Sequence, residues 1–125
     1  MTDADALLEQ AHEAAEHSYS PYSEFRVGAV VVTDDGEIFS GANVENAAYG
    51  SSVCAEANAI TTAIGSGARG ISTVAVACLD GDECEPCGNC LQMMVEFGVK
   101  RIINARGEHS LEDMLPFSFG PESLA

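Results

Sequence analysis

Residues 71–79 read Ile-Ser-Thr-Val-Ala-Val-Ala-Cys-Leu. The run is apolar at nearly every position, which is typical of a strand buried on both faces of a sheet. Residues 87–97 read as a buried helix with Gly98 at its end, and residues 99–105 supply another strand. A strand, a helix and a strand in this order predict helices that pack on a sheet.

A hairpin is predicted upstream of this unit. Residues 27–33 are almost wholly apolar and β-branched, residues 34–36 read Asp-Asp-Gly, and residues 37–40 continue as a second strand. Residues 54–64 read as a buried, alanine-rich helix that ends at a Gly-Ser-Gly segment. Strands and helices therefore alternate along the chain, which predicts an α/β fold.

Helices are also predicted near both ends of the chain. Residues 3–17 place apolar side chains at helical spacing beneath an acidic outer face, with Thr2 as the expected N-cap. The segment around Pro21 ends this helix, because proline disfavours helical backbone in the residue before it. Residues 111–125 hold a short helix and then an irregular tail.

The length and composition fit one domain that spans residues 1–125. A chain of 125 residues can bury a core of its own and is too short for two ordinary domains. With 46% hydrophobic residues and no run of about 18 apolar residues, we expect a soluble globular protein without a membrane span. The N-terminal segment is acidic and lacks the basic start of a secretory signal, so we expect a cytoplasmic location.

The charge balance is strongly acidic, with 20 Asp and Glu against 5 Lys and Arg and a net charge of -15. Binding of a nucleic-acid backbone depends on neutralisation by Lys and Arg, so a polynucleotide partner is not expected. Two interpretations of the acidic surface stay open. It is an ordinary solvated surface that aids solubility, or it is adapted to molar salt, where a Debye length of about 3 Å screens self-repulsion.

Five cysteines fit metal binding in a reducing compartment better than a disulfide framework, since their number is odd and they are clustered. Cys54 stands two residues before Glu56, and a Pro-Cys-Gly-Asn-Cys segment follows with Cys87 and Cys90. Catalytic zinc takes three protein ligands and keeps one position for water or substrate, whereas structural zinc takes four. Three cysteines beside one carboxylate therefore predict a catalytic zinc site, with one Zn²⁺ per subunit.

The chemistry predicted for this site is hydrolysis. Both groups of cysteines fall at predicted helix starts, where unpaired N–H groups and the helix dipole favour thiolates. Zinc lowers the pKa of its bound water to about 7. Glu56 lies close to the metal without binding it, so it can accept a proton from that water and pass it to the substrate. Zinc deaminases of nucleobases carry this combination of residues.

The cysteines also permit other interpretations. The Cys-x-x-Cys pair alone fits a structural zinc site or a redox pair, but both leave the upstream cysteine and glutamate without a role. Cys84 extends the pair to a spacing that iron–sulfur clusters use, but the bacterial ferredoxin pattern needs a further cysteine where the chain has Met94. Cys84 is therefore interpreted as a loop thiol, and Cys78 as a small core residue of its strand.

The sequence resembles the small, homotetrameric, zinc-dependent cytidine deaminases over nearly its whole length. Several motifs agree in order and spacing. They are Tyr22-Ser23-Glu24-Phe25-Arg26-Val27-Gly28-Ala29, Asn43-Val44-Glu45-Asn46-Ala47-Ala48-Tyr49, Cys54-Ala55-Glu56, Pro86-Cys87-Gly88-Asn89-Cys90 with Gln92, and Phe119-Gly120-Pro121-Glu122. The resemblance implies a three-layer α/β/α fold with a central mixed sheet of about five strands and helices on both faces. It also implies hydrolysis of cytidine and 2′-deoxycytidine to uridine and 2′-deoxyuridine with release of ammonia, as in pyrimidine salvage.

The resemblance further implies a nucleoside pocket. In that family an Asn-x-Glu motif holds the ribose hydroxyls, and the matching residues here are Asn43 and Glu45. Phe25 would line the pocket, and the main-chain N–H of Ala55 would contact the pyrimidine. Phe119 would reach into the site of a neighbouring subunit, which implies a homotetramer with inter-subunit active sites. Without the resemblance, the Asn-x-Glu residues also fit turn or surface positions and the phenylalanine at 25 fits a core.

The implied mechanism has Glu56 move protons while hydroxide attacks C4, with a main-chain carbonyl near Glu85 accepting from the leaving amino group. The sequence departs from the family at two positions. Three-cysteine members usually have Arg where this chain has Ala57 and Leu91, and such arginines offset the net charge of zinc with three thiolates. Helix dipoles, another cation such as Arg26, or a less acidic bound water could each account for the departure.

Three competing functions stay open. A related deaminase could act on another aminopyrimidine, such as blasticidin S or a free base. A zinc-stabilised binding protein without turnover is the second alternative. Polynucleotide editing is the third, and the acidic charge opposes it.

Overall fold

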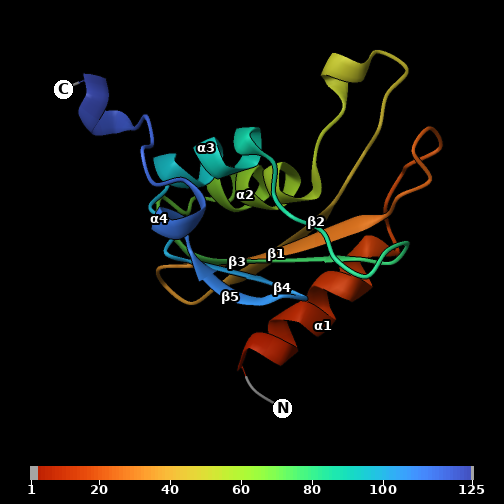
Figure 1. Cartoon of the computed structure of the whole chain (residues 1–125), viewed down its shortest axis with the longest axis horizontal. Coiled ribbons are helices and arrows are strands. Elements are labelled where there is room, and N and C mark those ends of the chain that lie inside the picture. The colour runs from red at the N-terminus through yellow and green to blue at the C-terminus, as the bar shows by residue number, and fades with distance from the viewer. Residues whose placement is uncertain (1–2, 125) are drawn as a thin grey trace.

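The computed structural model describes residues 3–124 and contains one five-stranded sheet (Figure 1). Its strands are β1 Val27–Thr33, β2 Ile38–Ala42, β3 Ile71–Cys78, β4 Arg101–Asn104 and β5 Gly107–Ser110. They lie in the order β2-β1-β3-β4-β5. β3 and β4 are parallel and every other neighbouring pair is antiparallel. The prediction of a mixed sheet of about five strands is confirmed.

Helices cover both faces of this sheet (Figure 1). α1 Asp3–Ala15 packs on one face against β1 and β3, and α2 Ala55–Gly65 and α3 Gly88–Glu96 lie on the other. The shorter helical segments are η1 Tyr49–Ser51, α4 Leu111–Met114 and η2 Pro121–Leu124. The predicted three-layer α/β/α arrangement is therefore confirmed. No helix within residues 3–124 is long and apolar enough to cross a membrane.

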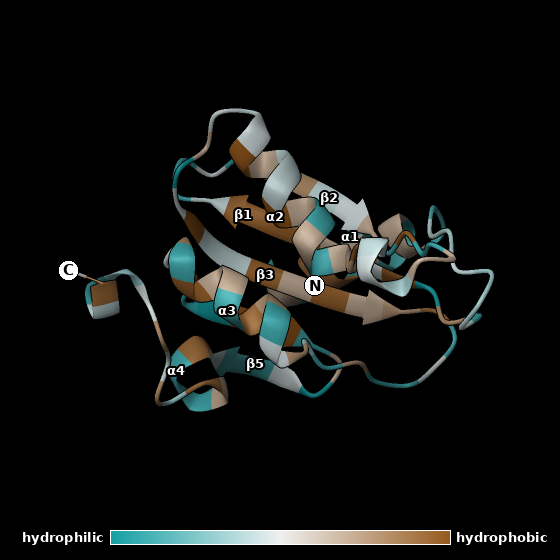
Figure 2. Ribbon diagram, turned by 90° about the horizontal axis from the view of Figure 1, so that it is seen from above, coloured by the Kyte–Doolittle hydropathy of each residue, from teal (hydrophilic) through white to brown (hydrophobic). Residues whose placement is uncertain are grey.

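Two apolar clusters hold the layers together. The larger lies between the sheet and the α2/α3 layer and includes Ile60, Val74 and Met94, all fully buried. The smaller lies between the sheet and α1 and includes Leu7 and Ile103. Figure 2 shows that the central strands β1 and β3 are largely apolar. Each fully buried aliphatic side chain stabilises the fold by about 1.5–3 kcal/mol, so these strands form a rigid support for the loops at their ends.

Gly28 in β1 allows α1 to approach the sheet closely. A Cβ atom at this position would lie 2.0 Å from the main-chain oxygen of Ala11 and 2.4 Å from the main-chain nitrogen of Ala15. Real Cβ atoms do not approach backbone atoms so closely. A side chain at this position would therefore require all of α1 to move away from the sheet. The glycine therefore fixes the spacing between these two layers.

Some predicted boundaries differ from the structure. The helix predicted over residues 3–17 ends at Ala15, because the N–H of His17 bonds to the carbonyl of Ala14 (3.0 Å) in a turn. The sequence does not predict β5, whose residues are polar and mostly exposed at the sheet edge. Thr2, the expected N-cap, lies outside the described residues.

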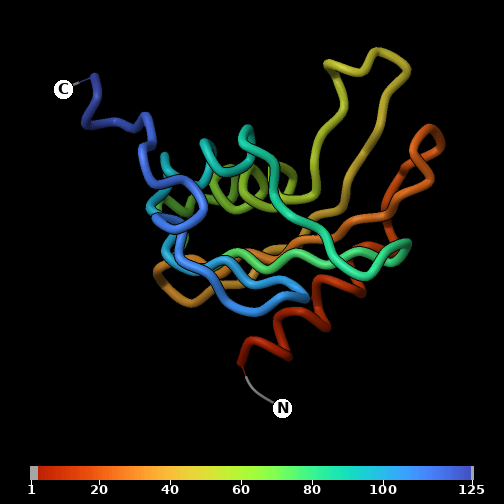
Figure 3. Tube along the Cα trace, in the orientation of Figure 1, coloured from red at the N-terminus to blue at the C-terminus, as the bar shows by residue number. Residues whose placement is uncertain are grey.

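Three of the segments that carry matched motifs gather at one end of the sheet (Figure 3). Residues 16–26 and 43–54 extend there together, joined by bridges from Val44 to Tyr19 and Val53 (Figure 3). Residues 79–87 connect β3 to α3. The C-terminal tail leaves the molecule on the opposite side (Figure 3). The fold thus brings three separate segments of the chain to one place.

Candidate active site

The three predicted zinc ligands meet at the starts of two helices. Cys54 is the N-cap of α2, Cys87 is the N-cap of α3, and Cys90 lies on the first turn of α3. Residues three apart at a helix start lie on the same side of the helix, so the last two sulfurs face one point. The three Sγ atoms all lie within 4.8 Å of one another, and no other such group of three occurs among residues 3–124.

This set of donors fits a zinc ion. Zn–S bonds of about 2.3 Å in tetrahedral geometry require sulfurs about 3.8 Å apart, which small side-chain rotations can reach. Neither N-cap thiol makes a side-chain capping hydrogen bond, and all three are free of disulfides. The sulfurs are therefore available as ligands. Three of them leave one tetrahedral position open, as in catalytic zinc sites.

Burial opposes ionisation of the thiols when no metal is bound. It raises the pKa of Cys54 and of Cys90, and the charge of Glu56 adds to both effects. The helix dipoles are expected to favour the thiolates, but the pKa of both Cys54 and Cys90 is raised and not lowered. A metal cation reverses this balance, because a coordinating thiol is deprotonated outright.

Glu56 is the only acidic side chain that is buried among residues 3–124. It lies on the first turn of α2 and is 5% exposed. Burial raises the pKa of its carboxyl group. A carboxyl group that takes up and releases its proton closer to neutral pH is suited to general acid–base catalysis.

Cys54, Cys87 and Glu56 line one cavity of about 200 Å³, and Cys90 lies buried beside them. The predicted substrate residues Phe25, Asn43 and Ala55 line the same cavity. The other residues that line it are Val27, Cys54, Glu56, Val76, Cys84, Glu85 and Cys87. Sequence reasoning places Cys84 in a loop, which is confirmed, but does not predict that it lines the site. Cys78 is buried in β3, as predicted.

Asn43 is tightly bonded within the chain. Its Oδ1 accepts hydrogen bonds from the main-chain N–H of Val27 (2.9 Å) and from the hydroxyl of Ser18. Its Nδ2 donates to the main-chain carbonyl of Phe25 (2.9 Å). The amide thus holds the start of β1 against the loop that follows β2. Its contact with ribose remains a prediction.

Glu45 lines a neighbouring hollow and not the cavity of the thiols. Tyr22, Ser23, Tyr49 and Ser52 line that hollow with it. The carboxylate accepts hydrogen bonds from the main-chain N–H groups of Tyr22 (3.0 Å) and Ser23 (3.1 Å) and from the hydroxyl of Ser23. These bonds, above all that from the Ser23 hydroxyl, lower the pKa of Glu45 and keep it ionised. Its role toward the sugar also remains a prediction.

Comparison with known proteins agrees with this geometry. The sequence model of a family described as "Cytidine and deoxycytidylate deaminase zinc-binding region" matches residues 1–106. The chain belongs to this family.

Known cytidine deaminases match nearly the whole chain. A cytidine deaminase of Sporosarcina psychrophila is 35% identical, over 98% of this chain and 96% of the relative. A cytidine deaminase of Mycobacterium tuberculosis is 39% identical, over 99% and 96%. The crystal structure of the cytidine deaminase from Burkholderia pseudomallei superposes with a TM-score of 0.84 at 39% identity, covering 95% of this chain and all of the other. That of the M. tuberculosis enzyme gives 0.87 at 34% identity, covering 96% and 99%.

Ala57 and Leu91, at the two positions where the family usually has arginine, carry no charge. Leu91 is buried in the larger core cluster, and Ala57 is half-buried on α2. Arg26 does not take the place of these arginines, because its guanidinium binds Asp80 (2.9 Å) and does not line the cavity. No Lys or Arg lines the cavity within the described part of this deaminase. The N-termini of α2 and α3 are the positive groups that remain at the thiols.

Phe119 lies away from the cavity of its own chain in this deaminase. The residue is 58% exposed, and its main-chain carbonyl accepts a hydrogen bond from Gln92. It belongs to the tail that leaves the molecule on the side opposite the loops (Figure 1). Phe119 could therefore reach a nucleoside pocket only in a second subunit, which remains a prediction.

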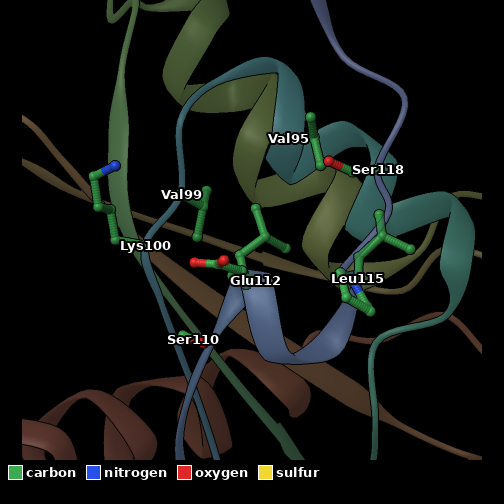
Figure 4. Close-up of a pocket in the computed structure, with 9 residues that line it drawn as sticks. Val95, Val99, Lys100, Ser110, Glu112, Leu115 and Ser118 are labelled. Carbon is green, nitrogen blue, oxygen red and sulfur yellow. The ribbon is translucent and has the colours of Figure 1, made fainter.

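A second hollow lies at the far end of α3, next to α4 (Figure 4). Apolar side chains such as Val95, Val99 and Leu115 line most of it, with Lys100 and Glu112 as the charged groups. It contains no cysteine or histidine. This hollow therefore lacks the sulfur and nitrogen ligands that bind zinc.

Proposed function

We propose that the chain hydrolyses cytidine and 2′-deoxycytidine to uridine and 2′-deoxyuridine with release of ammonia. One observation carries the proposal: two residues of the sulfur group that fits zinc, Cys54 and Cys87, line a single cavity together with Glu56, the only buried acidic residue of residues 3–124. Relatives named as cytidine deaminases, 35% and 39% identical, support this substrate class. A zinc ion held by Cys54, Cys87 and Cys90 would supply a water molecule acidic enough to attack near neutral pH.

The side chains of the cavity would carry out the remaining steps. Glu56 accepts the proton of the attacking water and delivers it to N3 of the pyrimidine. It then takes the proton of the hydroxyl newly bonded to C4 and passes it to the amino group, which leaves as ammonia. Phe25 supplies an apolar surface for the ring, and the main-chain N–H of Ala55 donates to the pyrimidine. Burial of the cavity floor excludes other water molecules and strengthens these polar contacts.

The charges around the cavity favour a nucleoside over a nucleotide. Asn43 and Glu45 are proposed to hold the sugar hydroxyls from adjoining hollows. Glu56 and Glu85 line the cavity and no basic side chain does, so no side chain of the cavity would offset the charge of a 5′-phosphate. Cytidine should therefore be converted at least about 100-fold more efficiently than its 5′-monophosphate, the order expected for a few kcal/mol of repulsion.

We also infer a homotetramer in the cytoplasm with active sites shared between subunits. Large apolar side chains are exposed in groups, and such groups mark protein contacts. The rings of Tyr22 (52% exposed) and Tyr49 (78%) lie 6.4 Å apart, and Phe117 (98%) and Phe119 (58%) both stand on the C-terminal tail. Five cysteines without a disulfide suit a reducing compartment. Light scattering after gel filtration should give four chains per particle, and Phe119→Ala should lower turnover without loss of zinc.

The zinc-loaded protein should convert cytidine, followed by the change in pyrimidine absorbance and by release of ammonia. Deoxycytidine, cytosine and blasticidin S are assayed in parallel. Turnover of blasticidin S alone would assign the chain to a different aminopyrimidine. Full zinc occupancy with no turnover of any of the four would favour a binding protein without catalysis. Metal-free protein is the matched control, because it retains every other contact.

A further inference from the structure

The loop of residues 79–87 carries part of the cavity wall. Cys84 and Glu85 line the cavity just before the proposed ligand Cys87. The loop contains no helix or strand, so its position depends on contacts with other elements. Those contacts determine the position of Cys84 and Glu85 relative to Glu56 and the proposed zinc ligands.

Asn104, the last residue of β4, supplies the buried contacts. It is 1% exposed. Its Nδ2 donates to the main-chain carbonyl of Cys84 (3.2 Å) and to the carboxylate of Glu85 (3.1 Å). Its Oδ1 accepts from the main-chain N–H of Arg106 (3.0 Å) and lies 3.1 Å from Nε2 of His109.

The partners fix the orientation of this amide. A main-chain carbonyl can only accept and a main-chain N–H can only donate, so Nδ2 must face Cys84 and Oδ1 must face Arg106. It follows that His109 donates from Nε2. Both donors and both acceptor positions of the amide are then used. A buried amide bonded on all sides holds its partners in one arrangement.

Arg106 adds a second connection at the surface. Its guanidinium pairs with Glu83 (2.9 Å) and Glu85 (3.0 Å) on either side of Cys84. These side chains are about half exposed, so water and salt weaken the pairs. The bonds of Asn104 are shielded from both. The buried amide therefore carries more of the restraint than the exposed ion pairs.

We propose that Asn104 is a positioning residue for the active site: through Cys84 and Glu85 it fixes the wall against which the pyrimidine binds. The proposal rests on the proposed function, since it assigns the cavity to a nucleoside. Nothing in the motif pattern points to Asn104, because an asparagine at a strand end also fits an ordinary turn position.

The test uses two substitutions of Asn104 and one matched control. Asn104→Asp keeps the size of the side chain and turns an oxygen toward two acceptors. Asn104→Ala removes the donors without adding a buried charge, so it keeps the test decisive if the first variant does not fold. The control is Thr33→Val, which removes a buried hydroxyl that accepts from the N–H of Glu37 (3.0 Å) at the opposite end of β1 from Val27.

At equal zinc content, the Asn104 variants should raise KM for cytidine about tenfold, the scale expected when a binding wall shifts by a fraction of an ångström. Amide hydrogen exchange of residues 83–87 should become about tenfold faster, since the loop opens more often. Thr33→Val should change neither by more than about twofold. Partial unfolding alone would lower kcat per chain and leave KM unchanged.

Unchanged KM with unchanged loop exchange would overturn the proposal, and so would a loss of kcat at constant KM. If the zinc-loaded wild-type protein does not deaminate cytidine, the proposed function fails instead. Loop exchange in the Asn104 variants then decides by itself whether this residue positions the wall.

Discussion

Replacement of Glu56 by Gln separates proton transfer from metal binding. The two side chains have the same shape, and Glu56 is only 5% exposed, so the amide fills the same space. The amide cannot exchange a proton near neutral pH. General acid–base catalysis contributes about 10²–10⁴-fold to a rate, so kcat should fall by that factor. This corresponds to about 2.7–5.4 kcal/mol at 1.36 kcal/mol per tenfold.

The same substitution should not weaken the metal-free fold. Burial raises the pKa of Glu56 in the folded chain, so the protonated form stabilises the fold at low pH. That stability is lost as the pH rises through the raised pKa, because the carboxylate is then ionised in an apolar place. Gln does not ionise. Metal-free Glu56→Gln should therefore melt no lower than the wild-type chain at neutral pH, and the difference should shrink as the solution is acidified.

The assay is steady-state conversion of cytidine together with metal analysis of the same samples. Glu112→Gln is the matched control, because Glu112 lines the second hollow far from the thiols. It should leave kcat and zinc content unchanged. A Glu56→Gln protein that holds its zinc and keeps more than about a tenth of the wild-type kcat would refute the assignment of Glu56 as the proton carrier.

Other measurements test the metal, the packing and the charges. Cys90→Ala should lose zinc to a chelator that leaves Cys84→Ala metallated, and metal analysis showing equal retention would contradict the ligand set. Gly28→Ala should lower the free energy of unfolding by about 1–3 kcal/mol, since its Cβ would lie 2.0 Å from backbone of α1; an unchanged urea midpoint would show that the helix adjusts freely. Arg26 lowers the pKa of Asp80 to about 2 from 3.8, so the stability from this pair is present above pH 3.8 and lost as the pH falls toward 2. Arg26→Gln should make the melting temperature depend less on pH in this range. Identical plots of melting temperature against pH for the variant and the wild-type protein would exclude the effect. Raising salt to 1 M shortens the Debye length to about 3 Å and should raise the melting temperature of a chain with net charge -15; a constant melting temperature would favour an ordinary solvated surface.

The metal site could be predicted because its pattern is local. Cys87 and Cys90 are three residues apart at a helix start, and Cys54 and Glu56 are two apart at another. Local spacing fixes which side chains share a helix face. The alternation of strands and helices then brings the two helix starts to the same side of the sheet. The central strands were equally predictable, because burial on both faces requires continuous apolar runs.

Contacts between distant segments could not be predicted in the same way. The pairing of Arg26 with Asp80 joins residues 54 positions apart, and nothing in either segment specifies the other. Asn104 likewise meets Cys84 only because β4 lies beside β3. β5 is short, polar and exposed, so it lacks the alternation that predicts a strand. The proposed role of Phe119 concerns a second chain, so contacts within one chain do not test it.

At the N-cap positions of α2 and α3, helix stability and zinc binding favour different residues. Cys54 and Cys87 occupy places where Ser, Thr, Asp or Asn would cap a helix, and neither thiol does so. A capping side chain contributes about 1 kcal/mol, so Cys54→Asp or Cys87→Asp should make the metal-free chain harder to unfold while it removes a ligand. Directed evolution that selects for heat resistance of the metal-free chain alone would therefore favour variants that lack a proposed zinc ligand at these two positions. Libraries built on this scaffold need a screen for turnover in every round.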